Sequence, residues 1–522
     1  MVSLVEKVAA MNFLRKNPML PAVTALAVGT LFAGWRIVPL WLAILLTALL
    51  LLLAVVGSFS RAGRADVATL LSLMFLGVSL SQMHNQLQRV SSERMVYTLT
   101  ADSPLNLNGG WWRGEARLES ACDESGVWHR ASGRVRLYAD SALRIDPPSR
   151  LMVSTRILPF RDSTGRYSRA MHRKGYVGVV FVRASDLLDV AHDTIGGVLL
   201  PRMHLQAVER VGRLELPPMN LALAEALATG ERGGLSADVR KNYSLSGVAH
   251  VLALSGLHVG MVLLVVNALF WWLPLLRRGH RIRNVAVILL LWVYMFMTGL
   301  SPSALRAALM FSLLQLSLFR SDSYSGINSL STAAFISLCW NPNLIYDAGF
   351  QLSYIAVAAI LLWGVPMCQK LRLTWSDTGR IGEALQRVAN ALISTIIIGF
   401  VATIATAPLI SHMFGVVSIV GVVLNPLIVA ISTIAVGVLV VWLFLPLEPL
   451  NWIISLIVRL STDAMNMLAG WFADEPWATL EIRLSGMATV ALYALMVVLT
   501  IVVSLFYERK GRQMGAKMEK IG

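Results

Sequence analysis

The chain of 522 residues is 56% hydrophobic and only 14% charged, with a mean hydropathy of +0.64. These values exclude an ordinary soluble globular protein and predict a polytopic α-helical membrane protein. The formal net charge of +15 has two open explanations. Basic residues concentrate in cytoplasmic loops of most membrane proteins, and a basic chain can also bind an anionic partner.

Cysteine usage limits the chemistry of the chain. Of its three cysteines, only Cys122 lies in the large polar region, so that region cannot hold an internal disulfide. No CxxC pair and no Cys/His spacing typical of zinc occurs. We therefore predict no bound metal and no cofactor.

Residues 1–83 are predicted to form an N-terminal membrane unit. Three hydrophobic runs, at 19–34, 38–57 and 65–83, are each close to the roughly 20 residues that cross a bilayer. No small-residue cleavage site precedes the first run, which indicates a retained anchor. Basic residues before the first run and between the second and third predict a cytoplasmic N-terminus: Lys7, Arg15, Lys16, Arg61 and Arg64. The segment after Met83 is then extracytoplasmic.

Residues 84–217 differ in composition from the rest of the chain. Short alternating stretches such as GRVRLYA, RLMVSTRIL and GYVGVVFV lie between Gly, Pro, Asp and Ser turns. This pattern predicts an inserted all-β domain, either an OB-like barrel or a small sandwich.

Basic and aromatic residues recur within this β region. OB-folds hold single-stranded nucleic acid in cationic grooves with stacking aromatics. A solvated basic surface, or one that faces lipid headgroups, explains the pattern equally well. The candidate DNA-binding residues are Arg156, Arg161, Arg166, Tyr167, Arg169, Arg173 and Lys174.

An amphipathic connecting helix is predicted in 218–246, followed by a membrane block over 247–507 and a basic cytoplasmic tail over 508–522. Residues 329–340 are too few for an untilted span, and the stretch around Asn425 and Pro426 resembles a broken or re-entrant helix. The apolar segments of the block are 247–273, 284–300, 302–319, 329–340, 348–365, 389–410, 416–445, 450–471 and 485–506.

The motif HVLALSGLHVG, from His250 to Gly260, places polar side chains in an apolar segment. If 247–273 is one helix, His250 and His258 lie about 12 Å apart along its axis and cannot share a metal. Ser255 and His258 are one turn apart, which allows a serine nucleophile with a histidine base. No carboxylate lies nearby in the sequence and no G-x-S-x-G elbow surrounds the serine. Gly256 suits close helix approach or a local break, and the histidines could instead satisfy packing hydrogen bonds.

Two further constellations carry polar residues. In TGLSPSALRAALM, Ser301 occupies an N-cap position, and Arg306 lies one turn into the helix, an arrangement that suits an anion. Ordinary capping, with an arginine that pairs with an acid or reaches the interface, is the alternative. The third constellation, in DAGFQLS, could supply that acid and consists of Asp347, Gln351 and Ser353.

Taken together, these motifs resemble the ComEC family of competence proteins. The matching segments are ATGERGGLSADVRKNYSLSGVAHVLALSGLHVG, GLSPSALRAALM, NPNLIYDAGFQLSYIAV and ATAPLISHMFGVVSIVGVVLNPL, in the family's order. The resemblance implies a multi-pass inner-membrane channel that conducts single-stranded DNA into the cytoplasm during natural transformation. It also implies that the translocation path or its packing involves His250, Ser255, Gly256, His258, Ser303, Arg306, Gln351, Ser353 and Asn425.

The sequence also departs from longer members of the family. Those end in a metallo-β-lactamase-like domain, whereas this sequence contains no HxHxDH cluster and no P-loop. We therefore expect no enzymatic activity and no catalytic residue. The implied partners are a DNA receptor outside, a cytosolic translocase ATPase, a separate nuclease and membrane lipid, with homo-oligomers open. The alternatives are an intramembrane serine hydrolase and a transporter of a smaller anionic solute.

Overall fold

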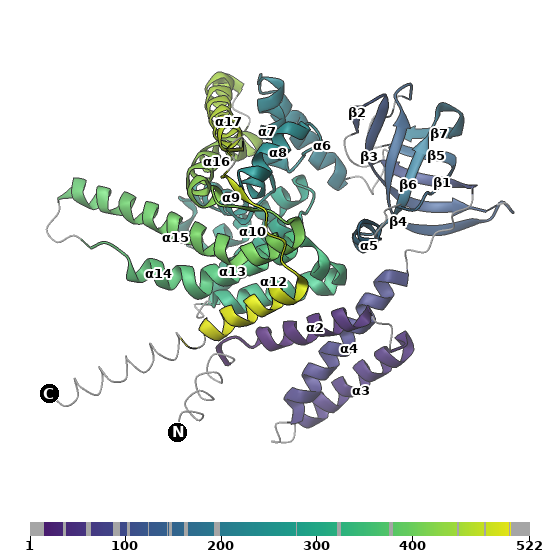
Figure 1. Cartoon of the computed structure of the whole chain (residues 1–522), viewed down its shortest axis with the longest axis horizontal. Coiled ribbons are helices and arrows are strands. Elements are labelled where there is room, and N and C mark those ends of the chain that lie inside the picture. Colours follow the sequence, from purple (N-terminus) through teal and green to yellow (C-terminus); the bar gives the residue numbers. More distant parts are fainter. Residues whose placement is uncertain are drawn as a thin grey trace.

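A computed structural model describes the chain from residue 15 to residue 502, with short gaps. The chain is mostly helical, with one β-sheet region between three N-terminal helices and the remaining helices (Figure 1). This confirms the predicted combination of apolar helices with an inserted β region. The N-terminal residues 1–14 and the basic tail lie outside the described residues. The gaps are 35–37, 59–63, 87–93, 102–104, 124, 144, 146–148, 161–164, 193–198, 278, 321–324, 375–378, 446–447, 474, 476 and 501.

Three apolar helices coincide with the three predicted runs: α2 (Met19–Ala33), α3 (Leu40–Ser58) and α4 (Arg64–Gln86). Glycines let α2 and α4 pack closely. A β-carbon on Gly29 would lie 1.8 Å from the carbonyl oxygen of Met74, and one on Gly77 would lie 2.3 Å from that of Leu26. Small residues at such crossings are typical of membrane helix pairs.

Seven strands form the sheet at the right of Figure 1, in the order β6-β4-β3-β1-β5-β7, with β2 paired to β3. Neighbouring strands are antiparallel except β4 and β6, which are parallel. A short helix, α5 (Arg166–Arg173), lies between β5 and β6 in sequence. The strands are β1 (Arg94–Ala101), β2 (Asn106–Asn108), β3 (Trp111–Cys122), β4 (Trp128–Asp140), β5 (Ser149–Arg156), β6 (Tyr176–Val182) and β7 (Leu187–His192).

The sheet curls so that the end of β5 meets β6. Leu158, just after β5, exchanges both backbone hydrogen bonds with Val179, each 2.8 Å long. The adjacent Gly178 permits this approach, because a β-carbon there would lie 2.4 Å from the carbonyl oxygen of Leu158. The enclosed core includes the fully buried side chains of Tyr97, Leu99, Val135, Leu137, Leu151, Val153 and Val180.

Three helices connect the sheet to the rest: α6 (Leu199–Gly212), α7 (Pro218–Thr229) and α8 (Ala237–Leu245). The predicted β region extends to residue 217, but the sheet ends at His192 and α6 packs with the helices instead. The physical reason is the helical spacing of the buried residues, since Ala207 and Val211 are four residues apart and both are buried. The indole of Trp442 also donates to the carbonyl of Arg210 at 2.9 Å.

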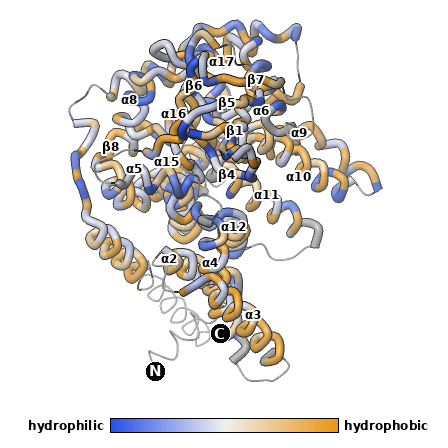
Figure 2. Tube along the Cα trace, turned by 90° about the vertical axis from the view of Figure 1, so that its right-hand side faces the viewer, coloured by the Kyte–Doolittle hydropathy of each residue, from blue (hydrophilic) through white to orange (hydrophobic). Residues whose placement is uncertain are grey.

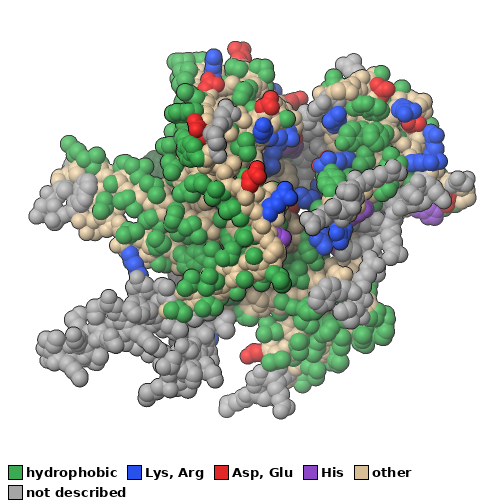
Figure 3. All heavy atoms as spheres, in the orientation of Figure 1, with side chains coloured by type: hydrophobic (Ala, Val, Ile, Leu, Met, Phe, Trp, Pro, Cys, Tyr) green, Lys and Arg blue, Asp and Glu red, His purple; other side chains and the backbone are tan. Residues whose placement is uncertain are grey.

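Six helical segments of the described part are long and apolar enough to cross a membrane: Asp66–His84, Gly279–Met297, Ala348–Lys370, Ile381–Phe414, Gly421–Phe444 and Glu448–Ala473. Figure 2 shows mostly apolar residues along α3 and α4, and Figure 3 shows apolar side chains over the outside of the helical region. Large apolar residues are accordingly exposed, such as Trp340.

The helices after α8 follow the predicted apolar segments. They are η2 (Ala249–Leu252), α9 (Gly256–Leu269), η3 (Leu273–Leu275), α10 (Gly279–Met297), α11 (Pro302–Arg320), α12 (Gly326–Trp340), η4 (Pro342–Tyr346), α13 (Ala348–Ala359), the π-helical turn η5 (Ile360–Gly364), α14 (Val365–Lys370), α15 (Arg380–Phe414), α16 (Gly421–Phe444), η6 (Glu448–Leu450) and α17 (Asn451–Ala473), with a shorter apolar helix Gly486–Thr500. Two short strands, β8 (Val417–Ser418) and β9 (Thr479–Leu480), pair with each other.

Two interruptions differ from the sequence interpretation. Residues 247–273 are not one helix, because η2 ends at Leu252 and α9 begins at Gly256. The stretch at Asn425 and Pro426 is unbroken, since α16 runs continuously through it. The chain is interrupted earlier, at Gly415, whose left-handed φ of 73° ends α15.

Candidate functional site

The motif from His250 to Gly260 forms a helix start rather than a helix interior. His250 lies in η2 and is exposed, whereas His258 lies in the first turn of α9 and is 1% exposed. Ser255 is the N-cap of α9, and its hydroxyl accepts from the N–H of Leu257 at 3.3 Å. The two histidines therefore belong to different elements, and Gly256 marks the break between them.

The hydrogen bonds of His258 fix its tautomer. Its Nδ1 accepts from the backbone N–H of Ser255 at 2.9 Å, as a glutamate does in a capping box. A neutral imidazole with Nδ1 as acceptor carries its hydrogen on Nε2. The Nε2 atom is buried and has no hydrogen-bond partner among the described residues. His258 thus presents an unused donor.

The Ser255 hydroxyl also lies 2.9 Å from Nδ1 of His258, which is the spacing of a serine and its base. However, the lone pair of Nδ1 already accepts the Ser255 N–H, and Nε2 has no carboxylate to orient the ring. The geometry is that of a capped helix. Across the described residues, no three His, Cys, Asp or Glu side chains converge in a way that could hold a metal ion.

Arg306, on α11, lies against the start of α9. A β-carbon on Gly256 would lie 3.4 Å from a guanidinium nitrogen of Arg306, so the missing side chain makes room for the cation. Arg306 is 5% exposed, and its Nε is buried without a hydrogen-bond partner among the residues that the structure describes. Its guanidinium carbon lies 5.9 Å from the ring centre of Tyr354 on α13. The positively charged side chain of Arg306 therefore packs against the N-terminus of α9, which carries a partial positive charge of its own.

Asp347 does not serve as the acid for Arg306. Its carboxylate caps α13 by accepting from the Phe350 N–H at 3.0 Å, and it forms an ion pair with Lys174 at 3.4 Å. Asp347 and Arg306 are both described, and no ion pair joins them. The pairing suggested by the sequence is wrong because η4 turns Asp347 toward α5 of the β region.

The N-terminal turns of α11 and α13 lie side by side. The hydroxyls of Ser303 and Ser353 are 3.1 Å apart, and α11 also packs against α9. Gln351 instead supports the entry to α13, because its side chain donates to the carbonyl of Ile345 at 2.6 Å. Ser301 precedes α11 as predicted, but its hydroxyl is buried and has no partner within the described ranges. The early turns of three helices thus converge near Arg306.

A fourth helix start lies on the other flank of η2. The first residue of α16, Gly421, touches Gly247, and a β-carbon on Gly247 would lie 3.1 Å from its α-carbon. One turn later, the side-chain oxygen of Asn425 is buried without a partner in the described part of the chain. Asn425 therefore lies on the helix that borders the motif.

The predicted basic residues of the β region divide into two groups. Arg156 ends β5, and Arg169 and Tyr167 lie on α5, where the Tyr167 ring contacts Phe160 at 5.7 Å. Arg161 and the side chain of Arg166 lie outside the described residues.

Arg173 and Lys174 contact the helical region instead. The Arg173 guanidinium lies 3.9 Å from the ring centre of Tyr346, and Lys174 binds Asp347. These two contacts, which we call the α5 latch, bring the basic helix to the start of α13. Figure 3 shows Lys and Arg side chains gathered where the β region faces the helices.

A polar cluster that the sequence interpretation missed joins α6, the turn after α7 and the end of α10. His204 lies 2.7 Å from the carbonyl of Met297 and 3.6 Å from the carboxylate of Glu231. Glu225, on α7, lies near this cluster. Its burial, and to a lesser extent repulsion from Glu231, raises its pKa to about 7. The glycine-rich turn GERGG could have signalled Glu231, but nothing in the sequence pairs it with His204.

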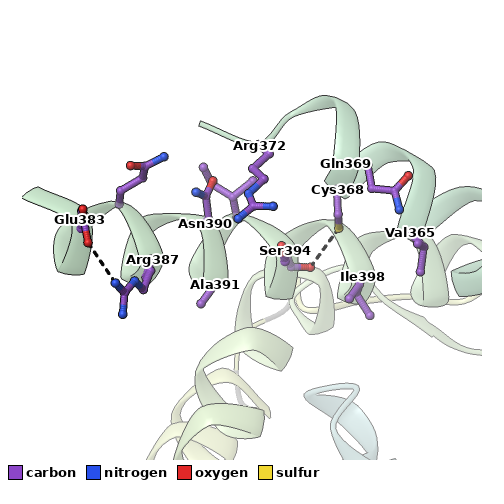
Figure 4. Close-up of a pocket in the computed structure, with 12 residues that line it drawn as sticks. Val365, Cys368, Gln369, Arg372, Glu383, Arg387, Asn390, Ala391, Ser394 and Ile398 are labelled. Atoms are coloured by element: carbon purple, nitrogen blue, oxygen red, sulfur yellow. Dashed lines mark hydrogen bonds and ion pairs between the residues drawn. The ribbon is translucent and has the colours of Figure 1, made fainter. Parts of the chain in front are cut away.

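A cavity of about 550 Å³ lies between α14 and the first turns of α15 (Figure 4). Its wall includes the ion pair of Glu383 with Arg387, at 3.1 Å, and the thiol of Cys368, which faces the carbonyl of Ser394. The cavity is open to the surface and contains no predicted site residue.

Comparisons with known proteins give a family and two relatives. A family model described as "Competence protein" matches residues 227–507, which is more than half of the chain. The chain is 28% identical over 220 residues to "ComE operon protein 3" of Bacillus subtilis (strain 168), covering 42% of this chain and 25% of that protein. It is 33% identical over 142 residues to an uncharacterized protein of Aquifex aeolicus (strain VF5), covering 27% and 33%. No solved structure matches. The alignments thus span a third or less of either relative.

Proposed function

Because the chain belongs to the competence protein family, whose work is DNA uptake, we propose that it is the inner-membrane channel that conducts a single strand of DNA into the cytoplasm. The observation that carries the proposal is the meeting of the early turns of α9, α11 and α13 around Arg306. Helix N-termini and arginine bind phosphate without reading bases, as transport of arbitrary DNA requires.

The β region is the proposed receiving domain on the outer face. The sheet has one parallel pair and a bridge between Leu158, just after β5, and Val179 on β6, which supports an OB-like assignment, the class of barrel that holds single strands in basic grooves. The α5 latch supports a continuous route, because it brings the basic helix to the start of α13. Binding through phosphates predicts a steep fall in affinity with salt.

The remaining assignments follow from this role. We propose that both termini are cytoplasmic and that the candidate spans and the shorter apolar helices are embedded in lipid. A receptor outside, a cytosolic translocase ATPase and a separate nuclease would supply capture, energy and strand degradation. The chain could act as a homo-oligomer.

Two other functions remain as alternatives. The hydroxyl of Ser255 beside His258 favours an intramembrane hydrolase, and labelling of Ser255 by a serine-reactive probe would support it. The buried Arg306 equally suits a transporter of a small anionic solute. Competition between oligonucleotides and small phosphates for the detergent-solubilised chain separates that function from DNA passage.

The test is uptake of a marked DNA fragment into the recipient cytoplasm. Wild type, a deletion and His258→Ala are compared at matched membrane abundance, with His280→Ala as the control because His280 is exposed at the start of α10. We expect the deletion and His258→Ala to lose uptake while DNA still binds at the cell surface, and His280→Ala to retain it. Normal uptake in the deletion strain would rule out the channel role.

A further inference from the structure

We propose that the N-terminus of α9 and the guanidinium of Arg306 form a binding site for one phosphodiester group of the DNA backbone. The choice of ligand rests on the proposed function. The site itself rests on two neighbouring features, the first turn of α9 and the buried Arg306, whose guanidinium packs against Gly256.

The site offers hydrogen-bond donors without matching acceptors. Arginine has no acceptor atom, and the Nε of Arg306 is buried without a partner in the described part of the chain. His258, in the same helical turn, has a buried Nε2–H without a partner among the described residues, because Nδ1 is engaged by Ser255. The early N–H groups of a helix lack acceptors within that helix. The Ser255 hydroxyl accepts from the N–H groups of Leu257 and His258, and its carbonyl accepts from that of Val259. Within the described part of the chain, this leaves the N–H of Gly256 available to a ligand. A group that accepts several hydrogen bonds would satisfy these donors together.

The charges also favour an anion. A buried arginine beside a helix N-terminus combines two positive charges that repel each other. The ring of Tyr354, 5.9 Å away, offers partial compensation, and Asp347 is engaged with Lys174 and the cap of α13. An anion on the open side of the α9 N-terminus, beside Arg306, would interact favourably with both, which is how helix N-termini bind phosphate.

The open side of the α9 N-terminus favours a phosphodiester group within a DNA strand over a free phosphate ion. The residues on the N-terminal side are accessible, with Ser255 and Gly256 half-buried and Leu257 41% exposed. An open side lets the two ester oxygens of a phosphodiester continue into the strand. One arginine matches its single negative charge, and Gly256 presents bare backbone to it.

The experiment uses the full chain in lipid nanodiscs with Leu257→Cys as a reporter and the natural cysteines replaced by serine: Cys122, Cys339 and Cys368. The rate of thiol alkylation is measured alone, with a phosphodiester oligothymidylate, with the same oligomer carrying an uncharged methylphosphonate backbone, and with inorganic phosphate. We expect only the phosphodiester oligomer to slow alkylation.

Arg306→Gln should weaken this protection roughly tenfold or more, because a charge-assisted contact is lost. Arg387→Gln removes the same charge at an exposed position on α15 and should change nothing. Gly256→Ala, whose methyl group approaches Arg306, gives a second variant if Arg306→Gln does not fold. Equal protection by the methylphosphonate oligomer or by inorganic phosphate, or unchanged protection in both variants, overturns the site.

Uptake assays with the same variants separate this site from the channel function. If the deletion abolishes DNA uptake but Arg306→Gln does not, the phosphodiester site is wrong and the channel role stands. If the deletion leaves uptake intact, the channel role is wrong whatever the protection shows.

Discussion

Substituting Gly247 by alanine should destabilise the junction between η2 and α16. Gly247 has φ of +77°, a conformation that costs a residue with a β-carbon about 1–2 kcal/mol. The new β-carbon would also lie 2.5 Å from Cβ of Ser418 and 3.1 Å from the α-carbon of Gly421. Overpacking of this kind costs about 1–3 kcal/mol, so the total loss is roughly 2–5 kcal/mol.

Gly299→Ala is the matched control. Gly299 has a similar φ of +70°, but a β-carbon there meets nothing within 4 Å. Gly299→Ala should therefore lose only the stability that the unfavourable φ costs. The difference in unfolding free energy between the two variants, about 1–3 kcal/mol, then measures the cost of overpacking at Gly247. The measurement is chemical denaturation of both purified chains in the same detergent. Equal stability of the two variants would refute the close contact between Gly247 and the start of α16.

Three other perturbations test different parts of the chain. α7 is not among the candidate spans, and the raised pKa of Glu225 means that the folded state holds this proton more tightly than the unfolded state. The protonated carboxyl group of Glu225 therefore contributes to stability fully below pH 4.5, and this contribution is lost as pH rises through about 7. Glu225→Gln should flatten the fall in melting temperature across this range, and an unchanged pH profile would count against a buried carboxyl group. Removing the α5 latch with Tyr346→Leu and Lys174→Ala should increase hydrogen exchange in α5 without lowering the stability of the sheet, since exposed contacts of these kinds contribute about 0–1 kcal/mol each. Tyr176→Phe removes a hydrogen bond to Glu115 and should destabilise the β region by about 1 kcal/mol in denaturant, whereas no loss would mean that water replaces the bond.

Local sequence patterns predicted the positions of the helices well, but they did not predict which elements pack against one another. Apolar runs of sufficient length gave the positions of α2, α3 and α4, and Gly256 signalled the break before α9. These features depend on neighbours in the chain. The sequence interpretation of residues 199–212 as part of the β region was wrong because burial of Ala207 and Val211 depends on helices far along the chain.

The candidate site shows the same limit. Sequence spacing gave Ser255 with His258 and placed Arg306 one turn into its own helix. It did not indicate that Arg306 lies at the start of α9, because that contact depends on how two helices pack. The pair of Asp347 with Lys174 is likewise set by the docking of the β region, which no local pattern contains.

The β region is attached to the helices in a way that limits its motion. The chain enters it after α4 and leaves it before α6, and α5 adds a third contact through Tyr346 and Asp347. With only the two chain connections, the β region could still rotate about the line that joins them. The contact of α5 with Tyr346 and Asp347 restrains that rotation. Because this contact is made by two cations at the surface, dissolved ions weaken it while the covalent attachments are unaffected. Ionic strength should therefore set the angular freedom of the whole β region.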